Sequence, residues 1–175
     1  TALTTILGTR SGVLIDTSGG GIQFNSGVLD FARTEIRVDP DVPLTFDSLR
    51  LSDGSKLNGS GVITGDVIND GAIVNPNTTA GNLTVDGDYT QTDNGTLSIL
   101  VGDPTADALD PFIVTGGVVF RGTLATGLKS GFSPTLGSSF TLSTFASRFG
   151  LFEDFTGVDA GANVELVPTV TDTEL

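Results

Sequence analysis

The chain has 175 residues, a formal net charge of −13, and no Cys, His, Met or Trp. Its length suits one domain or at most two. The missing Cys and His exclude a thiol nucleophile, a disulfide, a Ser–His–Asp triad and a zinc finger. The negative charge disfavours nucleic acid as a partner, because it would repel a phosphate backbone.

The composition predicts a chain that folds outside the cell. Apolar residues make up 38% of the chain and charged residues only 17%, which is too apolar for a disordered acidic segment. No apolar run reaches about 18 residues, so we expect no transmembrane segment. The lack of an initiator Met is expected for a processed or trimmed product, and the lack of Cys favours an extracellular, cell-surface location on a bacterium over an animal one.

Short runs rich in β-branched residues follow one another along the first half of the chain, and most are bounded by turn residues. They are Gly12–Ile15, Ile22–Phe24, Glu35–Val38, Leu44–Phe46 and Ser48–Leu51. Glycine occurs often enough, 24 times, to interrupt most windows that could hold three helical turns. This pattern predicts an all-β chain with many short strands.

A repeat occupies the middle of the chain. Gly61–Ile63, Gly71–Ile73 and Gly81–Leu83 recur at a spacing of ten residues, each followed by a polar turn. A fixed period of strand plus turn predicts stacked rungs that share one core. We therefore predict a short right-handed parallel β-helix, or β-solenoid, over residues 1–102, including an N-terminal strand. The alternative is a set of hairpins in a sandwich, whose turns also use Asn-Gly and Asp-Gly pairs.

The pattern changes after the polar connector Pro104–Pro111. Longer, Phe-rich runs follow, which predict a β-sandwich-like region over residues 103–175, either as a second domain or as part of one continuous domain. A final strand is expected within Asn163–Val170. The runs are Phe112–Thr115, Val118–Phe120, Thr123–Leu128 and Ser139–Phe145.

The segment "GNLTVDGDYTQTDNGTLSI" resembles a rung and strand found in passengers of bacterial autotransporters and in related secreted repeat proteins. The resemblance implies an extracellular β-helix used for adhesion, surface coating or scaffolding, and it assigns no catalytic residue. The membrane barrel of autotransporters has no counterpart here, so we expect a passenger fragment or a free secreted subunit. The matching residues are Gly81, Leu83, Val85, Gly87, Tyr89, Gln91, Gly95, Leu97 and Ile99.

Acidic residues provide the candidates for metal binding and catalysis. Their oxygen atoms could hold Ca²⁺, although Asp is also common in turns, and we favour turns and expect no cofactor. Paired carboxylates could also hydrolyse a polysaccharide, but no spacing singles out a pair, so we expect no enzyme. The candidate Ca²⁺ sets are Asp39 with Asp41, Asp86 with Asp88, and Asp103 with Asp107 and Asp110; the candidate catalytic residues are Arg50, Asp66, Asp70, Asp86 and Asp88.

The N-terminal run Ala2, Leu3, Thr4, Thr5, Ile6 and Leu7 alternates without a charge. It could add as a strand to an open sheet edge of a neighbouring copy, or fold back as the first strand of its own domain. Because no capping helix is evident, the first hypothesis is a secreted structural subunit that self-assembles head to tail into an extracellular filament or surface coat. The second is a monomeric adhesin that binds glycan or a host surface, and the third is a polysaccharide-active β-helix enzyme.

Overall fold

The computed structural model describes residues 14–16, 22–23, 27–76, 81–103, 111–161 and 164–175. These residues form strands joined by turns, and none of them is helical. The strands are β1 (Leu14–Asp16), β2 (Ile22–Gln23), β3 (Val28–Ala32), β4 (Glu35–Val38), β5 (Leu44–Ser52), β6 (Lys56–Gly59), β7 (Gly61–Asp70), β8 (Ile73–Asn75), β9 (Leu83–Asp86), β10 (Tyr89–Gln91), β11 (Thr96–Val101), β12 (Phe112–Val114), β13 (Gly117–Phe120), β14 (Thr123–Leu128), β15 (Ser143–Thr144), β16 (Ser147–Gly150) and β17 (Asp154–Thr156).

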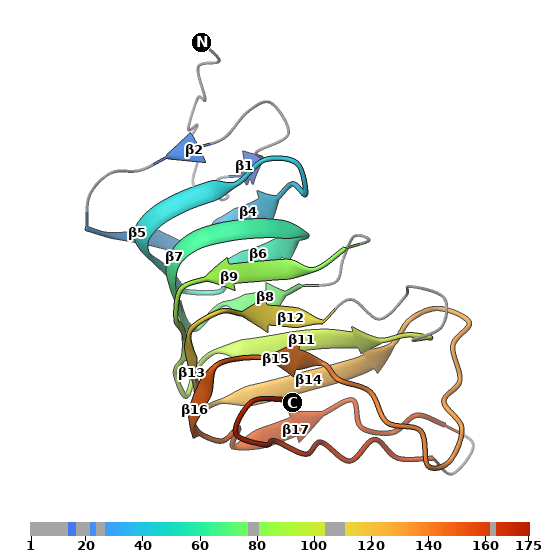
Figure 1. Cartoon of the computed structure of the whole chain (residues 1–175). Helices are drawn as coiled ribbons and strands as arrows, with labels where there is room; N and C mark the ends of the chain where they lie inside the picture. The colour runs from blue at the N-terminus through green and yellow to red at the C-terminus, as the bar shows by residue number, and fades with distance from the viewer. Residues whose placement is uncertain (1–13, 17–21, 24–26, 77–80, 104–110, 162–163) are drawn as a thin grey trace.

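All pairings between these strands are parallel, and they build two sheets (Figure 1). The seven-stranded sheet has the order β1-β4-β6-β8-β11-β14-β17. The ten-stranded sheet divides at β7, because the first half of β7 pairs with β9 and its second half pairs with β10. We call β9, β12 and β15 the first branch, and β10, β13 and β16 the second branch.

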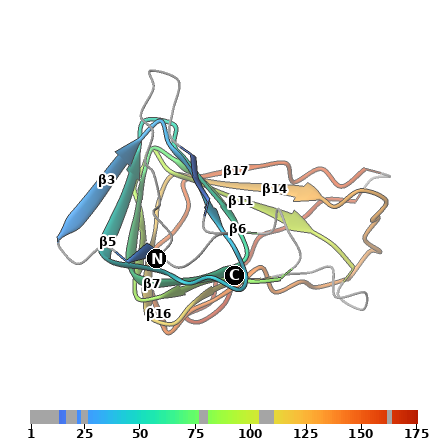
Figure 2. The same ribbon diagram turned by 90° about the horizontal axis from the view of Figure 1, so that it is seen from above.

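The chain visits the first branch, the second branch and the seven-stranded sheet in turn. Strands β9, β10 and β11 make one such circuit, and β12, β13 and β14 make the next one beside it. Seen from above, the circuits superimpose around a common interior (Figure 2). Two neighbouring parallel strands need a long connection between them, and in this chain the connection consists of the strands that the chain adds to the other branch and the other sheet before it returns.

The prediction of a solenoid followed by a β-sandwich is wrong. The finding that overturns it is a curled parallel sheet facing a second parallel sheet, both of which continue through the Phe-rich part of the chain. No antiparallel sandwich sheet forms within the described residues; only isolated antiparallel bridges occur. The Phe-rich strands are explained by position instead, since Phe112 and Phe120 are completely buried in the same core as the earlier strands.

The ten-residue rung is also wrong. Gly61 is aligned with Leu83, whereas Ile73 lies between them in the chain but belongs to the other sheet. Units ten residues apart therefore face each other across the core, and units about twice that distance apart are neighbours. The strand expected within Asn163–Val170 is absent from residues 164–170, where Glu165 makes only an isolated bridge to Asp159.

Aligned apolar side chains fill the interior as columns. In the seven-stranded sheet, register places one such column on successive strands, and all its members before the last are completely buried. The column contains Ile36, Leu57, Val74, Leu97, Leu124 and Phe155. Burial of large aliphatic side chains contributes about 1.5–3 kcal/mol each relative to exposure, so these columns are the main source of stability.

Close approach between circuits requires glycine at a corner of the ten-stranded sheet. Gly65 has a φ of 116°, and a Cβ there would collide with the carbonyl oxygen of Phe46 in the preceding circuit. Only glycine combines this backbone conformation with this contact at low cost. The glycine that the sequence pattern treats as turn punctuation thus also sets the packing distance between circuits.

Candidate functional site

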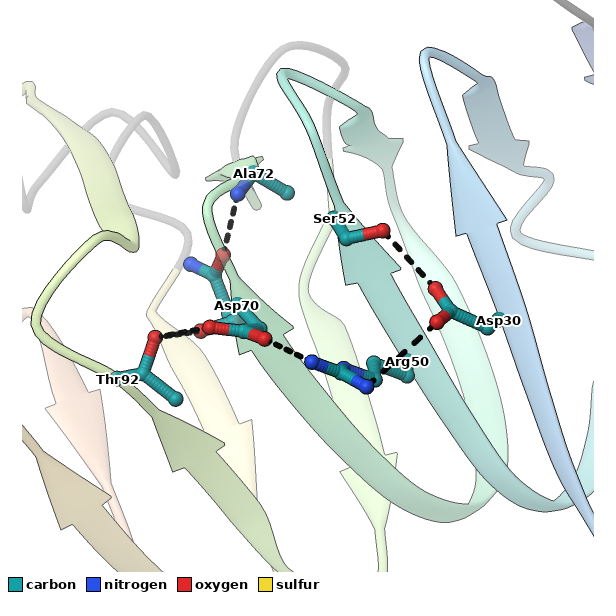
Figure 3. A network of polar contacts seen from close by, with 7 residues as sticks. Asp30, Arg50, Ser52, Asp70, Ala72 and Thr92 are labelled. Atoms are coloured by element: carbon teal, nitrogen blue, oxygen red, sulfur yellow. Dashed lines mark hydrogen bonds and ion pairs between the residues drawn. The ribbon is translucent and has the colours of Figure 1, made fainter.

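A polar network crosses the outer face of the ten-stranded sheet (Figure 3). Arg50 on β5 lies between Asp30 on β3 and Asp70 on β7, with 3.6 Å from Nη1 to the nearer Asp30 oxygen and a hydrogen bond from Nη2 to Asp70. Ser52 donates to Asp30 over 2.9 Å, and Thr92 donates to Asp70 over 2.7 Å. The network therefore ties three strands, β3, β5 and β7, to the residue that follows β10.

The network's electrostatics fit a structural tie better than acid–base chemistry. The hydrogen bond from Arg50, followed by that from Thr92, lowers the pKa of Asp70. The carboxylates in turn raise the pKa of Arg50. Asp70 is therefore ionised at neutral pH and lacks the proton that a general acid needs.

The other predicted acidic residues tie one circuit to the next. Asp66 accepts a hydrogen bond from the backbone amide of Asp88 over 2.9 Å, and Asp88 accepts one from the amide of Gly117 over 2.7 Å. Asp86 accepts from the hydroxyl of Thr115 over 2.9 Å. The structure thus brings Asp66 and Asp88 together at one corner but leaves them apart from Arg50 and Asp70, which belong to the outer network.

The candidate Ca²⁺ sets do not converge in the described part of the chain. No group of three or more Asp, Glu, His or Cys side chains lies close enough there to hold a metal ion. Asp39 instead accepts a hydrogen bond from the amide of Asp41 over 3.1 Å, which is turn chemistry. Asp107 and Asp110 lie outside the described residues.

Sequence reasoning missed a polar network inside the core. Asn69 donates to Tyr89 Oη and Gln91 Oε1, both over 3.2 Å, and to the carbonyl of Thr96 over 3.1 Å, while its Oδ1 accepts from the amide of Ala72 over 3.0 Å. Asn69, Tyr89 and Gln91 are completely buried. Burial raises the pKa of the Tyr89 hydroxyl, which stays neutral and donates to Gln91 over 2.8 Å. The network fixes the corner between the second branch and the seven-stranded sheet.

At the C-terminal end of the stack, the chain covers part of its own edge. Residues 171–175, which we call the tail, run antiparallel to β15 with a bridge between Thr144 and Glu174. The amide of Leu142 donates to the carbonyl of Leu175 over 2.7 Å, and the amide of Leu175 donates to Ser143 over 3.0 Å. Leu175 is only 6% exposed. The tail thus closes the edge of the first branch.

A charged side chain occupies the end of the second branch. Arg148 is aligned with the buried Val118, and it donates from Nε to the carbonyl of Thr171 and from Nη1 to that of Gly150, over 2.8 and 2.7 Å. The Oδ1 atom of Asp172 lies 3.6 Å from Nη2 of Arg148. A charge at a core-facing position of an edge strand opposes pairing with a further strand.

The third edge remains open among the described residues. β17 ends the seven-stranded sheet, and no described strand pairs with its outer side. Phe155 on β17 is 43% exposed although it continues a buried column, and Leu151, between β16 and β17, is 54% exposed. The C-terminal end thus combines a covered edge, a guarded edge and an open apolar edge.

The predicted donor strand Ala2–Leu7 lies outside the described residues. Within the described residues, no helix is both long and apolar enough to cross a membrane. No family model, curated protein or solved structure matches the chain.

Proposed function

We propose that this chain is a secreted structural subunit that self-assembles end to end into an extracellular filament or surface coat. The observation that carries the proposal is the exposure of Phe155. It closes a column whose other members are completely buried, yet 43% of it faces solvent beside a strand edge that no described strand pairs with. Open strand edges next to apolar side chains are templates for adding another chain.

The opposite end of the stack supports the same proposal. Val28 on β3 is 59% exposed, and Leu29 and Phe31 are only partly buried against the core. The two ends belong to the same sheets, and within each sheet neighbouring strands are parallel, so a second copy shifted along the stack can continue both sheets. A head-to-tail contact of this kind does not close on itself and therefore grows a filament.

The expected strength of one contact is modest. Complete burial of a Phe side chain contributes about 1.5–3 kcal/mol, so covering the exposed part of Phe155 adds about 1 kcal/mol. Each additional strand hydrogen bond contributes about 0.5–1.5 kcal/mol net. The net charge of −13 on each copy opposes the contact. Assembly is therefore expected to depend strongly on protein concentration and ionic strength.

Sedimentation velocity over a concentration series tests this function. We expect the wild-type chain to form large species, and Phe155→Asp to remain monomeric because it places a charge at the contact. Leu136→Asp is the matched control, because Leu136 is 90% exposed and lies in a loop outside the strands. A wild-type chain that stays monomeric at every concentration contradicts the proposal, as does a Phe155→Asp chain that assembles like the wild type. Far-ultraviolet circular dichroism confirms that both variants remain folded.

A further inference from the structure

We infer that the contact between copies joins β1 of one copy to β17 of the next, as an in-register parallel pair. This inference rests on the proposed function and names the surface and partner it uses. β1 and β17 are the two outermost strands of the same seven-stranded sheet. Since every pairing in that sheet is parallel, a second copy shifted along the stack presents β1 to β17 in the orientation of the existing pairs.

The other two edges at the C-terminal end are unsuitable. The tail already occupies the edge of β15, with the Thr144–Glu174 bridge in place of a further strand. Arg148 lies at the edge of β16, where its guanidinium donates hydrogen bonds to carbonyl oxygens of the same copy. A strand added there would have to cover that charge. Phe149 on β16 is exposed as well, but Arg148 lies at that edge; among the described residues, β17 combines unpaired backbone with the exposed Phe155 and carries no such charge at its core-facing position.

The register of the contact follows from the columns. Ile15 is aligned with Ile36, which begins the buried part of the column that ends at Phe155. Continuing this register across the contact puts Ile15 of the second copy beside Phe155. The same register puts Asp16, which is aligned with Arg37, beside Thr156, which is aligned with Ala125. In backbone register, an isoleucine of the second copy is therefore aligned with the position at which the first copy leaves Phe155 exposed.

Disulfide trapping tests this contact cleanly, because the chain has no Cys of its own. Neighbouring strands lie about 4.8 Å apart, within the roughly 4.4–6.8 Å between Cα atoms that a disulfide bridges. Strands β1 and β17 lie at opposite ends of the stack (Figure 1), so in the variant carrying both Asp16→Cys and Thr156→Cys a disulfide between the two positions must join two copies. The matched control carries Asp16→Cys and Leu136→Cys, the latter at a more exposed position.

Under mild oxidation at a concentration where the wild type assembles, we expect the Asp16→Cys/Thr156→Cys chain to give a ladder of multimers on non-reducing gels. The ladder should form at least about tenfold faster than in the control. Equal rates, or no ladder while the wild type sediments as large species, would overturn the β1–β17 contact and leave the proposed function standing. Failure of the wild type to assemble is scored separately by sedimentation and overturns the function itself.

Discussion

Replacing Asn69 with Leu removes the centre of the buried polar network while keeping the number and branching of the side-chain heavy atoms. Asn69 satisfies the amide of Ala72 and the carbonyl of Thr96, and both lose that partner in the variant. Each unsatisfied buried group costs about 1–3 kcal/mol, and the additional apolar burial of Leu offsets part of the loss. We therefore expect Asn69→Leu to lower the free energy of unfolding by about 3 kcal/mol.

Urea unfolding measures this loss, and Tyr89 supplies the fluorescence signal, because the chain has one Tyr and no Trp. The matched control is Asn58→Leu, since Asn58 makes an exposed hydrogen bond to Glu35 over 2.9 Å. We expect the control to cost less than about 1 kcal/mol. If Asn69→Leu is no more destabilising than Asn58→Leu, the buried network does not fix this corner and the reasoning is refuted.

Three further predictions concern protonation, packing and charge. Because burial raises the pKa of Tyr89, its hydroxyl loses its proton at a lower pH in the unfolded chain than in the folded one. The free energy of unfolding should therefore fall by about 1.4 kcal/mol per pH unit above about pH 10. Urea titrations that give Tyr89→Phe the same dependence on alkaline pH as the wild type would contradict this. Gly65→Ala should lower the free energy of unfolding by at least about 2 kcal/mol more than Gly27→Ala. Both glycines have positive φ, but only at Gly65 would the added Cβ collide with backbone, so equal urea midpoints for the two variants would contradict the prediction. Raising NaCl from 10 to 150 mM should speed assembly followed by light scattering, because the Debye length falls from about 30 to about 8 Å and each copy carries a charge of −13; slower assembly in salt would mean that charge repulsion does not limit the contact.

Local pattern was sufficient for many strands but not for their arrangement. Alternation and turn residues predicted Glu35–Val38 and Thr123–Leu128 with the bounds of β4 and β14. The ten-residue period corresponds to the length of one strand and its turn, and it does not indicate to which sheet the strand belongs. The sandwich prediction failed because longer, Phe-rich strands fit the interior of the same parallel sheets, where Tyr89 and Phe112 meet edge to face at 5.1 Å.

The candidate sites depended on register, which the sequence pattern did not supply. Asp70 is 20 positions from Arg50, and only the pairing of β5 with β7 brings them together. Alternation of buried and exposed residues could have indicated Asn69 and Gln91, because both fall at core-facing positions of otherwise apolar strands. The exposed Phe155 had no local signal, since its exposure results from its position on the last strand of a sheet.

Helical reconstruction from electron micrographs tests end-to-end assembly most directly. Seven strands at about 4.8 Å per strand predict filaments whose subunits repeat every 34 Å or so along the axis, because β1 of each copy directly follows β17 of the one before. Filaments with that rise and one polarity are the expected result. Monodisperse particles at all concentrations and salt conditions, or filaments whose rise does not correspond to the strand count, would contradict it.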